Sequence, residues 1–258
     1  MDHPLRGDFD ISNQILLSVR PEAQEFLRPR LVMRRLSQGQ VLYEEGTPFT
    51  HAIFPHEGMV SIMAAMRDGR GVEKVSIGYE GFIGIALAMG GGEAIGQSCV
   101  VVPGYASWLS IQDLDEAIAR FPCVRHALLR YAKSLIVQLL ESVACNSLHS
   151  AEERISRWLL HAHDRVVGNS FHLTQAAISQ ALGLRRATVN MVCSKLMEDG
   201  AIAYARGNLT VLERDLVEQR SCECYGRIRK AFDRNSQPLD RFIDEMPLPF
   251  RSAAPESG

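Results

Sequence analysis

The sequence predicts an α+β fold with three parts: an N-terminal antiparallel β-roll of the jelly-roll type, a long helix, and a C-terminal winged helix-turn-helix. Three observations support this order. Short apolar segments separated by glycines fill residues 31–112, a continuous helical pattern follows Pro122, and two short helical patterns followed by two short strands occupy residues 173–212. We therefore expect four segments: a β-roll sensor domain over 1–112, a dimerisation helix over 113–150, a winged helix-turn-helix domain over 151–225, and an extended C-terminal tail over 226–258.

Composition places the chain among globular proteins. It has 258 residues, of which 46% are hydrophobic and 22% are charged, and this suits about two domains. No run of about 18 apolar residues could span a bilayer, and the first residues, MDHPLRGDFD, lack the apolar core of a signal peptide. We expect a cytoplasmic protein without a membrane partner, whose six cysteines are reduced thiols rather than a disulfide framework.

The β-roll is predicted by short apolar segments between glycines such as Gly46, Gly58 and Gly69, a pattern typical of strands joined by turns. The segment from Gly78 to Gly84 superficially resembles a phosphate-binding loop. Glycines at β-corners give the same pattern, however, and no helix start clearly follows this segment. The expected strands include Gln40–Tyr43, His51–Phe54, Met59–Met63 and Val72–Ile77.

A short helical stretch is expected to begin at Asp113, and the long helix is expected to begin after it, at Phe121-Pro122. The long helix carries two rows of mostly apolar residues. The first row alternates steps of four and three residues, which is the spacing of a coiled-coil seam. We expect one row to pack on the β-roll and the other to pack against a second subunit in a twofold homodimer; the alternative is that one chain buries both rows. We assign the subunit contact to the first row, namely Leu128, Tyr131, Leu135, Gln138, Ser142 and Cys145. The second row is Leu129, Ile136, Leu140 and Val143.

Residues 173–200 predict two short helices joined by a tight turn. Apolar residues recur at helical spacing in both helices, and Gly183 supplies the turn where a side chain would clash. Thr174 precedes the first apolar residue, so its hydroxyl is expected to accept a backbone N–H and cap the first helix. After Gly200, two short alternating strands joined by a turn at Arg206-Gly207 predict a β-hairpin wing.

The polar side of this unit predicts DNA binding. Residues 165–206 hold five basic and two acidic residues, a net charge of +3, although the whole chain has a net charge of −2. In the major groove an arginine can bridge guanine O6 and N7, and an asparagine can bridge adenine, whereas an arginine at a wing tip meets phosphate. The alternative is an ordinary solvated face. The residues expected to contact double-stranded DNA are Thr174, Gln175, Arg185, Arg186, Thr188, Asn190, Lys195 and Arg206.

A longer motif, LTQ...LG..R..V...L...G.I...RG, runs from Leu173 to Gly207. Together with the order of the three parts, this motif resembles the Crp/Fnr family of bacterial transcription regulators over roughly residues 15–225. Supporting matches are Phe54-Pro55-x-x-Gly58, Gly78-x-Glu80-Gly81-x-x-Gly84, Cys145-Asn146-x-Leu148-His149 and Arg154-x-x-x-Trp158-Leu159-Leu160.

The resemblance implies that Arg186 is a principal base-reading residue and that RNA polymerase is a partner. Ala187 and Met191 replace the acidic and basic residues that usually flank this arginine, so the operator sequence does not follow from the resemblance. Two recognition helices about 34 Å apart would meet successive major grooves. A homodimer is therefore expected to bind an inverted repeat.

The effector region departs from the family members that bind cyclic AMP, which use a Gly-Glu-x-x-Leu run followed by Arg-Ser. Here Gly84-Ile85-Ala86-Leu87 stands at the first position and Ile95-Gly96 stands near the second. A phosphate buried without a cation would be poorly compensated, so no cyclic nucleotide is expected and the effector is unknown. The first cysteine is Cys99, so the N-terminal cysteine cluster of oxygen-sensing relatives is missing and no cofactor is expected.

Two cysteine sites remain. Cys193 lies in the second helix of the helix-turn-helix, where Arg186 and the DNA backbone could favour its thiolate, and we hypothesise a redox brake there. The alternative is a simple, partly buried small residue. Cys222-Glu223-Cys224 could be half of a metal site, but no second pair with matching spacing is evident, so a metal is not expected.

The predicted function is therefore recognition: a sequence-specific DNA-binding transcription regulator. The alternative is a redox-sensing or small-molecule-sensing module whose contact with DNA is secondary. The chain shows no Ser/His/Asp order, no recognisable pair of catalytic carboxylates and no Walker-type Gly-Lys-Ser/Thr, so no enzyme is expected.

Overall fold

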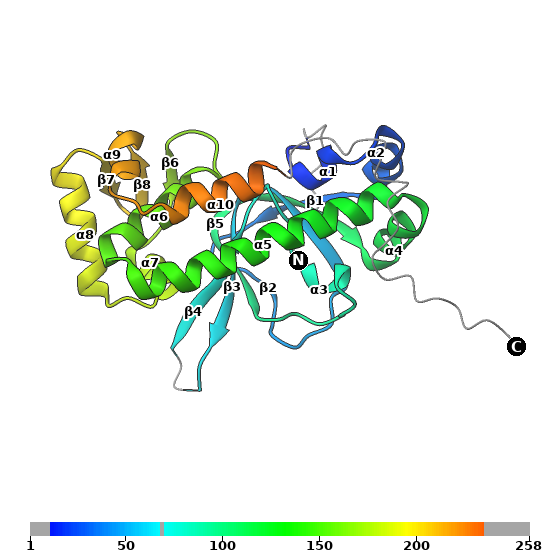
Figure 1. Cartoon of the computed structure of the whole chain (residues 1–258), viewed down its shortest axis with the longest axis horizontal. Coiled ribbons are helices and arrows are strands. Elements are labelled where there is room, and N and C mark those ends of the chain that lie inside the picture. The colour runs from blue at the N-terminus through cyan, green and yellow to red at the C-terminus, as the bar shows by residue number, and fades with distance from the viewer. Residues whose placement is uncertain (1–10, 68–69, 235–258) are drawn as a thin grey trace, which may run out of the picture.

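The structure of the chain is a computed structural model that describes residues 11–67 and 70–234. A β-roll, a long helix and a small helical domain with a β-hairpin follow one another along the chain (Figure 1), which confirms the predicted α+β class. None of the helices in this described part is both long enough and apolar enough to cross a lipid bilayer.

The β-roll is built on two long antiparallel strands, β3 (His51–Ala65) and β5 (Gln97–Ser110), which pair along most of their length. The sheet has the order β1-β5-β3-β4, and β2 also pairs with β5. The remaining elements of this part are α1 (Gln14–Ser18), α2 (Pro21–Leu27), the 3₁₀ turn η1 (Arg28–Arg30), β1 (Val32–Leu36), β2 (Val41–Tyr43), β4 (Gly71–Ile77) and α3 (Ile85–Ala88).

The predicted strands His51–Phe54 and Met59–Met63 are parts of one strand, β3, so the expected break at Gly58 is wrong. Gly58 lies where the register against β5 shifts, and its φ is +90°. A Cβ at this position would lie 2.6 Å from the carbonyl oxygen of Val102. The glycine therefore permits a close backbone approach at a bulge inside the strand, not a turn between two strands.

The long helix α5 (Pro122–Leu148) begins at Pro122 as predicted, after α4 (Ile111–Arg120). A further helix, α10 (Cys224–Asp233), lies along α5 (Figure 1), and the Ser134 hydroxyl donates to the carbonyl oxygen of Ala231 over 2.9 Å. The expected extended tail is therefore wrong for residues 226–233. Ile228 and Phe232, four residues apart, give this segment an apolar face that is buried in the same core as α5. Positions 235–258 of the predicted tail lie outside the described residues.

The first row of α5 faces its own chain. Most of its side chains are buried by the β-roll and by α10, and Cys145 is buried beside Cys222 and Cys224. Gln138 Nε2 donates to the carbonyl oxygen of Ser76 over 3.3 Å. Side chains that one chain already buries cannot meet a second subunit, so the assignment of the subunit contact to the buried residues of this row is wrong. Leu128, Tyr131, Leu135, Gln138 and Cys145 are each at most 4% exposed, and Ser142 is half-buried.

The C-terminal domain contains the predicted helix-turn-helix and wing. The hydroxyl of Thr174 accepts a hydrogen bond from the backbone N–H of Ala177 over 3.1 Å, and Gly183 adopts a φ of +63° at the turn, so both local predictions are confirmed. A third strand, which the sequence did not reveal, completes the small sheet. The elements are α6 (Ala151–His163), β6 (Ser170–His172), α7 (Gln175–Leu182), α8 (Arg186–Glu198), β7 (Ile202–Ala205), β8 (Asn208–Val211) and α9 (Arg214–Gln219).

A buried ion pair docks this domain on the β-roll. Arg165, just after α6, is 4% exposed; its Nη2 lies 2.6 Å from Glu80 Oε1, and its Nη1 donates to the Ser76 hydroxyl over 2.9 Å. Burial acts to lower the pKa of Arg165, but the attraction of Glu80 raises it overall, so the guanidinium remains charged. Trp158 of α6 also donates its indole N–H to the Glu73 carboxylate of β4, over 3.2 Å.

The glycines between Gly78 and Gly84 serve this docking and not a phosphate. A Cβ on Gly78 would lie 2.4 Å from Cδ of Arg165, and a Cβ on Gly81 would lie 2.2 Å from the ring of Tyr131. Only a residue without a side chain leaves room for the arginine and for α5 at these two positions. The superficial likeness to a phosphate-binding loop therefore has a packing origin.

Replacing one member of the ion pair should strongly destabilise the chain. For Glu80→Gln, we expect the free energy of unfolding to fall by about 3–5 kcal/mol, because Arg165 would remain buried without its counter-ion. Urea denaturation followed by circular dichroism measures this loss. The matched control is Glu45→Gln, which removes an exposed partner of Lys74 and should cost less than about 1 kcal/mol. Equal effects of the two substitutions would contradict the role of the pair.

Candidate nucleic-acid interface

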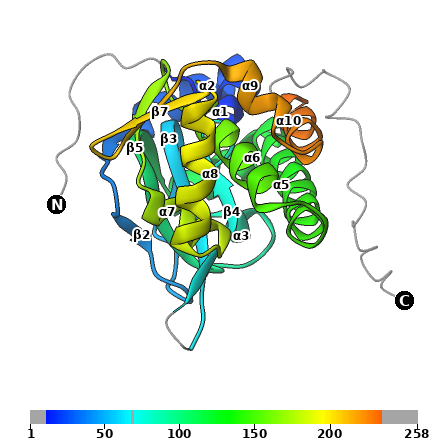
Figure 2. The same cartoon turned by 90° about the vertical axis from the view of Figure 1, so that its left-hand side faces the viewer.

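Helix α8 lies at one end of the molecule, the end that faces the viewer in Figure 2. Its inner face buries Val189, Val192 and Leu196 in the core of the domain, which also includes Met59, Val101 and Val102 of the β-roll. Its outward residues include Arg186 at the start of the helix and Asn190 one turn later, both exposed. The helix therefore presents hydrogen-bond donors on the side that a DNA groove could reach.

The predicted contact residues from the two helices gather in one region. Arg185 is exposed immediately before α8, and Thr188 is half-buried in its first turn. Gln175, the first residue of α7, accepts a hydrogen bond from the side-chain amide of Asn190 over 3.4 Å. Because Thr174 caps α7 at the same place, the start of α7 and the start of α8 form one continuous polar surface.

Arg206 lies at the tip of the wing, between β7 and β8, and is exposed. It has a φ of +52°, a conformation that residues with side chains rarely adopt. Gly207 follows it, and a Cβ there would lie 2.8 Å from the ring of His172. The tight turn thus holds the arginine at the tip of the hairpin, where a phosphate contact was predicted.

Two of the five basic residues counted in this region do not add free charge to it. Arg165 is buried in the ion pair with Glu80, and Lys195 Nζ lies 2.8 Å from Glu152 Oε2. The charges that remain on the surface are Arg185, Arg186 and Arg206, none of which forms a salt bridge within residues 11–67 and 70–234. Lys195, whose side chain is 54% exposed, therefore shares its charge with Glu152 of α6.

The anchoring contacts of α8 were missed by the sequence analysis. Arg220, after α9, places Nη1 2.6 Å from Glu152 and Nη2 2.5 Å from Asp199, which ends α8. Together with Lys195, these side chains join the C-terminal end of α8 to α6. No sequence signal identifies them, because charged residues of this kind are ordinary on solvated helices.

The structure contradicts the redox hypothesis for Cys193. The side chain is completely buried on the inner face of α8 and does not face Arg186 or the outer surface. Burial raises the pKa of its thiol to about 11. A buried, protonated thiol is a poor nucleophile, so Cys193 is a small core residue, more deeply buried than the alternative expected.

The two segments compared above with the cyclic AMP motif border a small apolar pocket in this chain. Gly84, Ile85, Ala86, Ile95 and Gly96 line it, and Leu135 of α5 closes one side. Ser98 is polar, but no charged side chain from the described part of the chain lines the pocket. Just outside this lining, Lys74 Nζ donates to the carbonyl oxygen of Ile95 over 2.5 Å.

The comparisons with known proteins agree with this geometry. Residues 153–220 match the family model described as the Crp-like helix-turn-helix domain. The fold is similar to FixK2 from Bradyrhizobium japonicum, with 15% identity, a TM-score of 0.61, and coverage of 74% of this chain and 98% of that chain. It is also similar to a CRP-family transcriptional regulator from Thermus thermophilus, with 18% identity, a TM-score of 0.60, and coverage of 72% and 95%.

A third similar structure is CLP, a c-di-GMP-responsive global regulator of Xanthomonas campestris. It shares 16% identity and a TM-score of 0.58, over 74% of this chain and 99% of that one. No curated protein sequence gives a significant match. The chain thus contains a Crp-like helix-turn-helix domain, within a fold that it shares with the Crp/Fnr transcription regulators.

Cys193 should resist alkylation in the folded chain. A pKa of about 11 leaves roughly one thiol in a thousand ionised at pH 8, and burial excludes the reagent as well. We expect iodoacetamide at pH 8 to label Cys193 only after unfolding in urea, as followed by mass spectrometry. Cys99, which is more exposed on β5, is the internal control. Labelling of Cys193 at equal rates in the folded and the urea-unfolded chain would refute its placement.

Proposed function

We propose that this chain is a sequence-specific DNA-binding transcription regulator that inserts α8 into the major groove, and that it is a binding protein rather than an enzyme. The observation that supports this most directly is the exposed polar face of α8, with Arg185 and Arg186 at its start and Arg206 on the adjacent wing. In helix-turn-helix proteins the start of the second helix contacts base edges.

The interface divides into reading and positioning contacts. Arg186 and Asn190, on the outward face of α8, match the donors that guanine and adenine accept in the major groove. Arg206 and the capped start of α7 at Thr174 and Gln175 are suited to phosphate. Within the described residues, the basic side chains of this interface that form no salt bridge are Arg185, Arg186 and Arg206. We therefore expect the affinity for DNA to depend moderately on salt concentration, mainly through these three arginines.

We further propose that the chain forms a twofold homodimer through the second row of α5. Leu129, Ile136, Leu140 and Val143 follow one another by steps of seven, four and three residues, and Leu140 and Val143 are 65% and 67% exposed. An apolar row at this spacing on a helix of 27 residues matches a coiled-coil seam. A symmetric pair would present two copies of α8 to an inverted repeat.

The effector of this regulator would not be cyclic AMP, because no charged side chain of the described residues lines the pocket around Gly84 and Ile95. The resemblance to Crp/Fnr regulators supports RNA polymerase as a partner, and the cytoplasm as the place where the protein acts. The assignments of RNA polymerase and the cytoplasm depend on the proposed role as a DNA-binding regulator, so a failure of the DNA-binding test would remove their basis.

The DNA interface is tested by substituting its arginines. For Arg186→Ala, we expect a loss of about 1–3 kcal/mol in binding to a genomic fragment that the native chain retains, and little change for random DNA. For Arg206→Ala, we expect the binding free energy to fall by the same amount for the genomic fragment and for random DNA. We also expect the affinity of this variant to depend less steeply on salt concentration. Fluorescence anisotropy in a salt series measures both effects.

Arg28→Ala is the matched control, since Arg28 is an exposed arginine on η1 of the β-roll. The Arg28→Ala variant should bind both DNAs with the affinity of the native chain. If Arg186→Ala bound the genomic fragment as tightly as Arg28→Ala does, α8 would not be the reading helix.

The homodimer is tested by a charge in the proposed seam. We expect the native chain to show twice its 28.7 kDa mass in analytical ultracentrifugation, and Leu140→Glu to show the mass of one chain, because the carboxylate would be buried against its symmetry copy. The control is Met89→Glu, at an exposed methionine of the β-roll. A native chain that sediments as a monomer at micromolar concentration would contradict the seam.

A further inference from the structure

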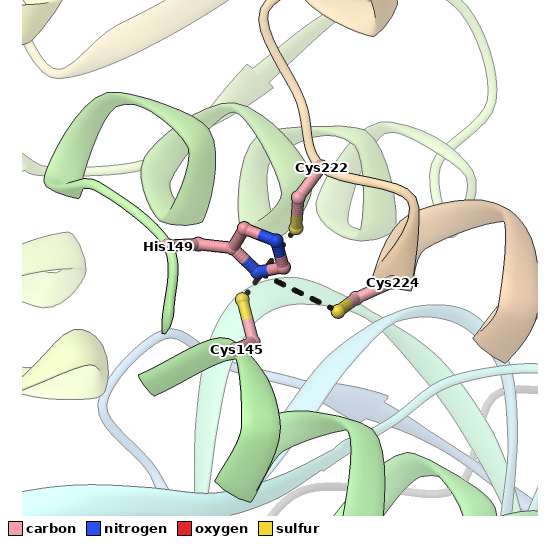
Figure 3. Close-up of side chains that lie close together, drawn as sticks. All are labelled: Cys145, His149, Cys222 and Cys224. Atoms are coloured by element: carbon pink, nitrogen blue, oxygen red, sulfur yellow. Dashed lines mark hydrogen bonds between the residues drawn. The ribbon is translucent and has the colours of Figure 1, made fainter. Parts of the chain in front are cut away.

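Three cysteines and a histidine from distant parts of the chain meet at the end of α5. Cys145 lies in the last turn of this helix, and His149 follows it one turn later. Cys222 lies between α9 and α10, and Cys224 is the first residue of α10 (Figure 3). The Sγ atoms of Cys145 and Cys222 are 3.5 Å apart, and the Cys224 Sγ lies 3.7 Å from Nδ1 of His149. All four donor atoms lie within 4.8 Å of one another.

These separations match the coordination sphere of one ion. Four ligands at the corners of a tetrahedron, with metal–sulfur bonds of about 2.3 Å, stand roughly 3.8 Å from one another. An iron–sulfur cluster distributes its thiolates over several irons and needs a wider cage. The four side chains turn toward a common centre (Figure 3), as ligands of a single ion do.

The three thiols do not belong to the ordinary hydrophobic core. They are at most 5% exposed, yet they form a cluster of their own, apart from the core of the β-roll and from the core of the helix-turn-helix domain. Cysteines that merely fill space pack among aliphatic and aromatic side chains. Here the buried sulfur atoms face one another and an imidazole.

The surroundings of the cluster suit a metal as well. Glu223 Oε2 lies 3.3 Å from Nε2 of His149, so the carboxylate orients the ring and leaves Nδ1 to face the sulfurs. Arg157 is 5% exposed, and its Nε has no hydrogen-bond partner in the described part of the chain. Its positive charge acts on Cys145 and would balance the negative charge that three thiolates leave on a divalent ion.

We propose that Cys145, His149, Cys222 and Cys224 bind one zinc ion in a tetrahedral site. Three thiolates and one imidazole are the donors of structural zinc centres, and a filled set of four protein ligands leaves no position open for a substrate. Zinc binding releases the remaining thiol protons to solvent. The site departs from the expectation of no metal, which rested on the absence of a second ligand pair next to Cys222 and Cys224 in the sequence.

The proposed ion joins two places where the chain changes direction. Cys145 and His149 lie at the end of α5, just before α6 begins. Cys222 and Cys224 lie at the start of α10, which packs back on α5. Arg220, two residues before Cys222, holds Asp199 at the end of α8. The ion would therefore fix α10 and the C-terminal end of α8 to the long helix. Its effect on DNA rests on the proposed function, but the site itself does not.

The test uses the full-length reduced chain, purified without chelator. We expect one zinc per chain by elemental analysis, and after removal of the zinc we expect Co²⁺ to produce the intense charge-transfer absorption of thiolate–cobalt bonds. Zinc should slow the alkylation of Cys145, Cys222 and Cys224 but not that of Cys99. Cys222→Ser should lose the thiolate–cobalt absorption, whereas Cys99→Ser, the matched control, should retain it.

Glu223→Ala keeps all four ligands and probes the orientation of His149. It should weaken zinc binding by about 10- to 100-fold while one zinc per chain still binds. The proposal is overturned if the native reduced chain neither retains zinc nor gives thiolate–cobalt absorption, or if mass spectrometry finds Cys145 and Cys222 joined in a disulfide in the chain as isolated. These measurements do not involve DNA, so they stand or fall separately from the proposed regulator.

Discussion

The buried ion pair between Arg165 and Glu80 fixes the position of the DNA-binding domain on the β-roll. Because Arg165 is almost fully buried, a small rotation of the domain would separate two charges inside a poorly polar interface, at a large cost in free energy. The glycine at position 78 leaves the space that the arginine stem occupies. The direction in which α8 points is thus determined by a contact far from its own surface. A signal that redirects α8 has to change this contact or move both parts together.

Helix α5 carries three different interfaces on one rod. One face is buried by the β-roll and α10, a neighbouring face exposes an apolar row at coiled-coil spacing, and the last turn brings Cys145 and His149 to Cys222 and Cys224. A change in the packing of α5 therefore reaches the β-roll, the proposed partner subunit and the anchoring of α8. This arrangement offers a physical route between the pocket that Leu135 closes and the DNA-binding surface, without a flexible linker.

Local features of the fold were predictable and long-range pairings were not. Thr174, Gly183 and Pro122 act on their nearest neighbours, so their positions defined the cap, the turn and the helix start. The two rows of α5 have similar spacing, and their pattern alone does not reveal which row the β-roll buries. Cys145 and Cys222 are 77 residues apart in sequence, so only the folded chain shows that they meet.

Cys193 was wrongly predicted to be a redox site, because the sequence pattern placed it in the correct helix but did not show that it lies on the buried face of that helix. The DNA-contact surface was predicted as a set of side chains, but the pairing of Lys195 with Glu152 required the tertiary structure.

The most direct test of a dimeric reader of DNA is selection of bound duplexes from a random pool, followed by sequencing. Two copies of α8 related by a twofold axis should enrich an inverted repeat whose half-sites are centred about one helical turn, roughly 34 Å, apart. Enrichment of a single asymmetric site would contradict the symmetric arrangement. A pool that remains random after repeated rounds would contradict recognition of DNA sequence altogether.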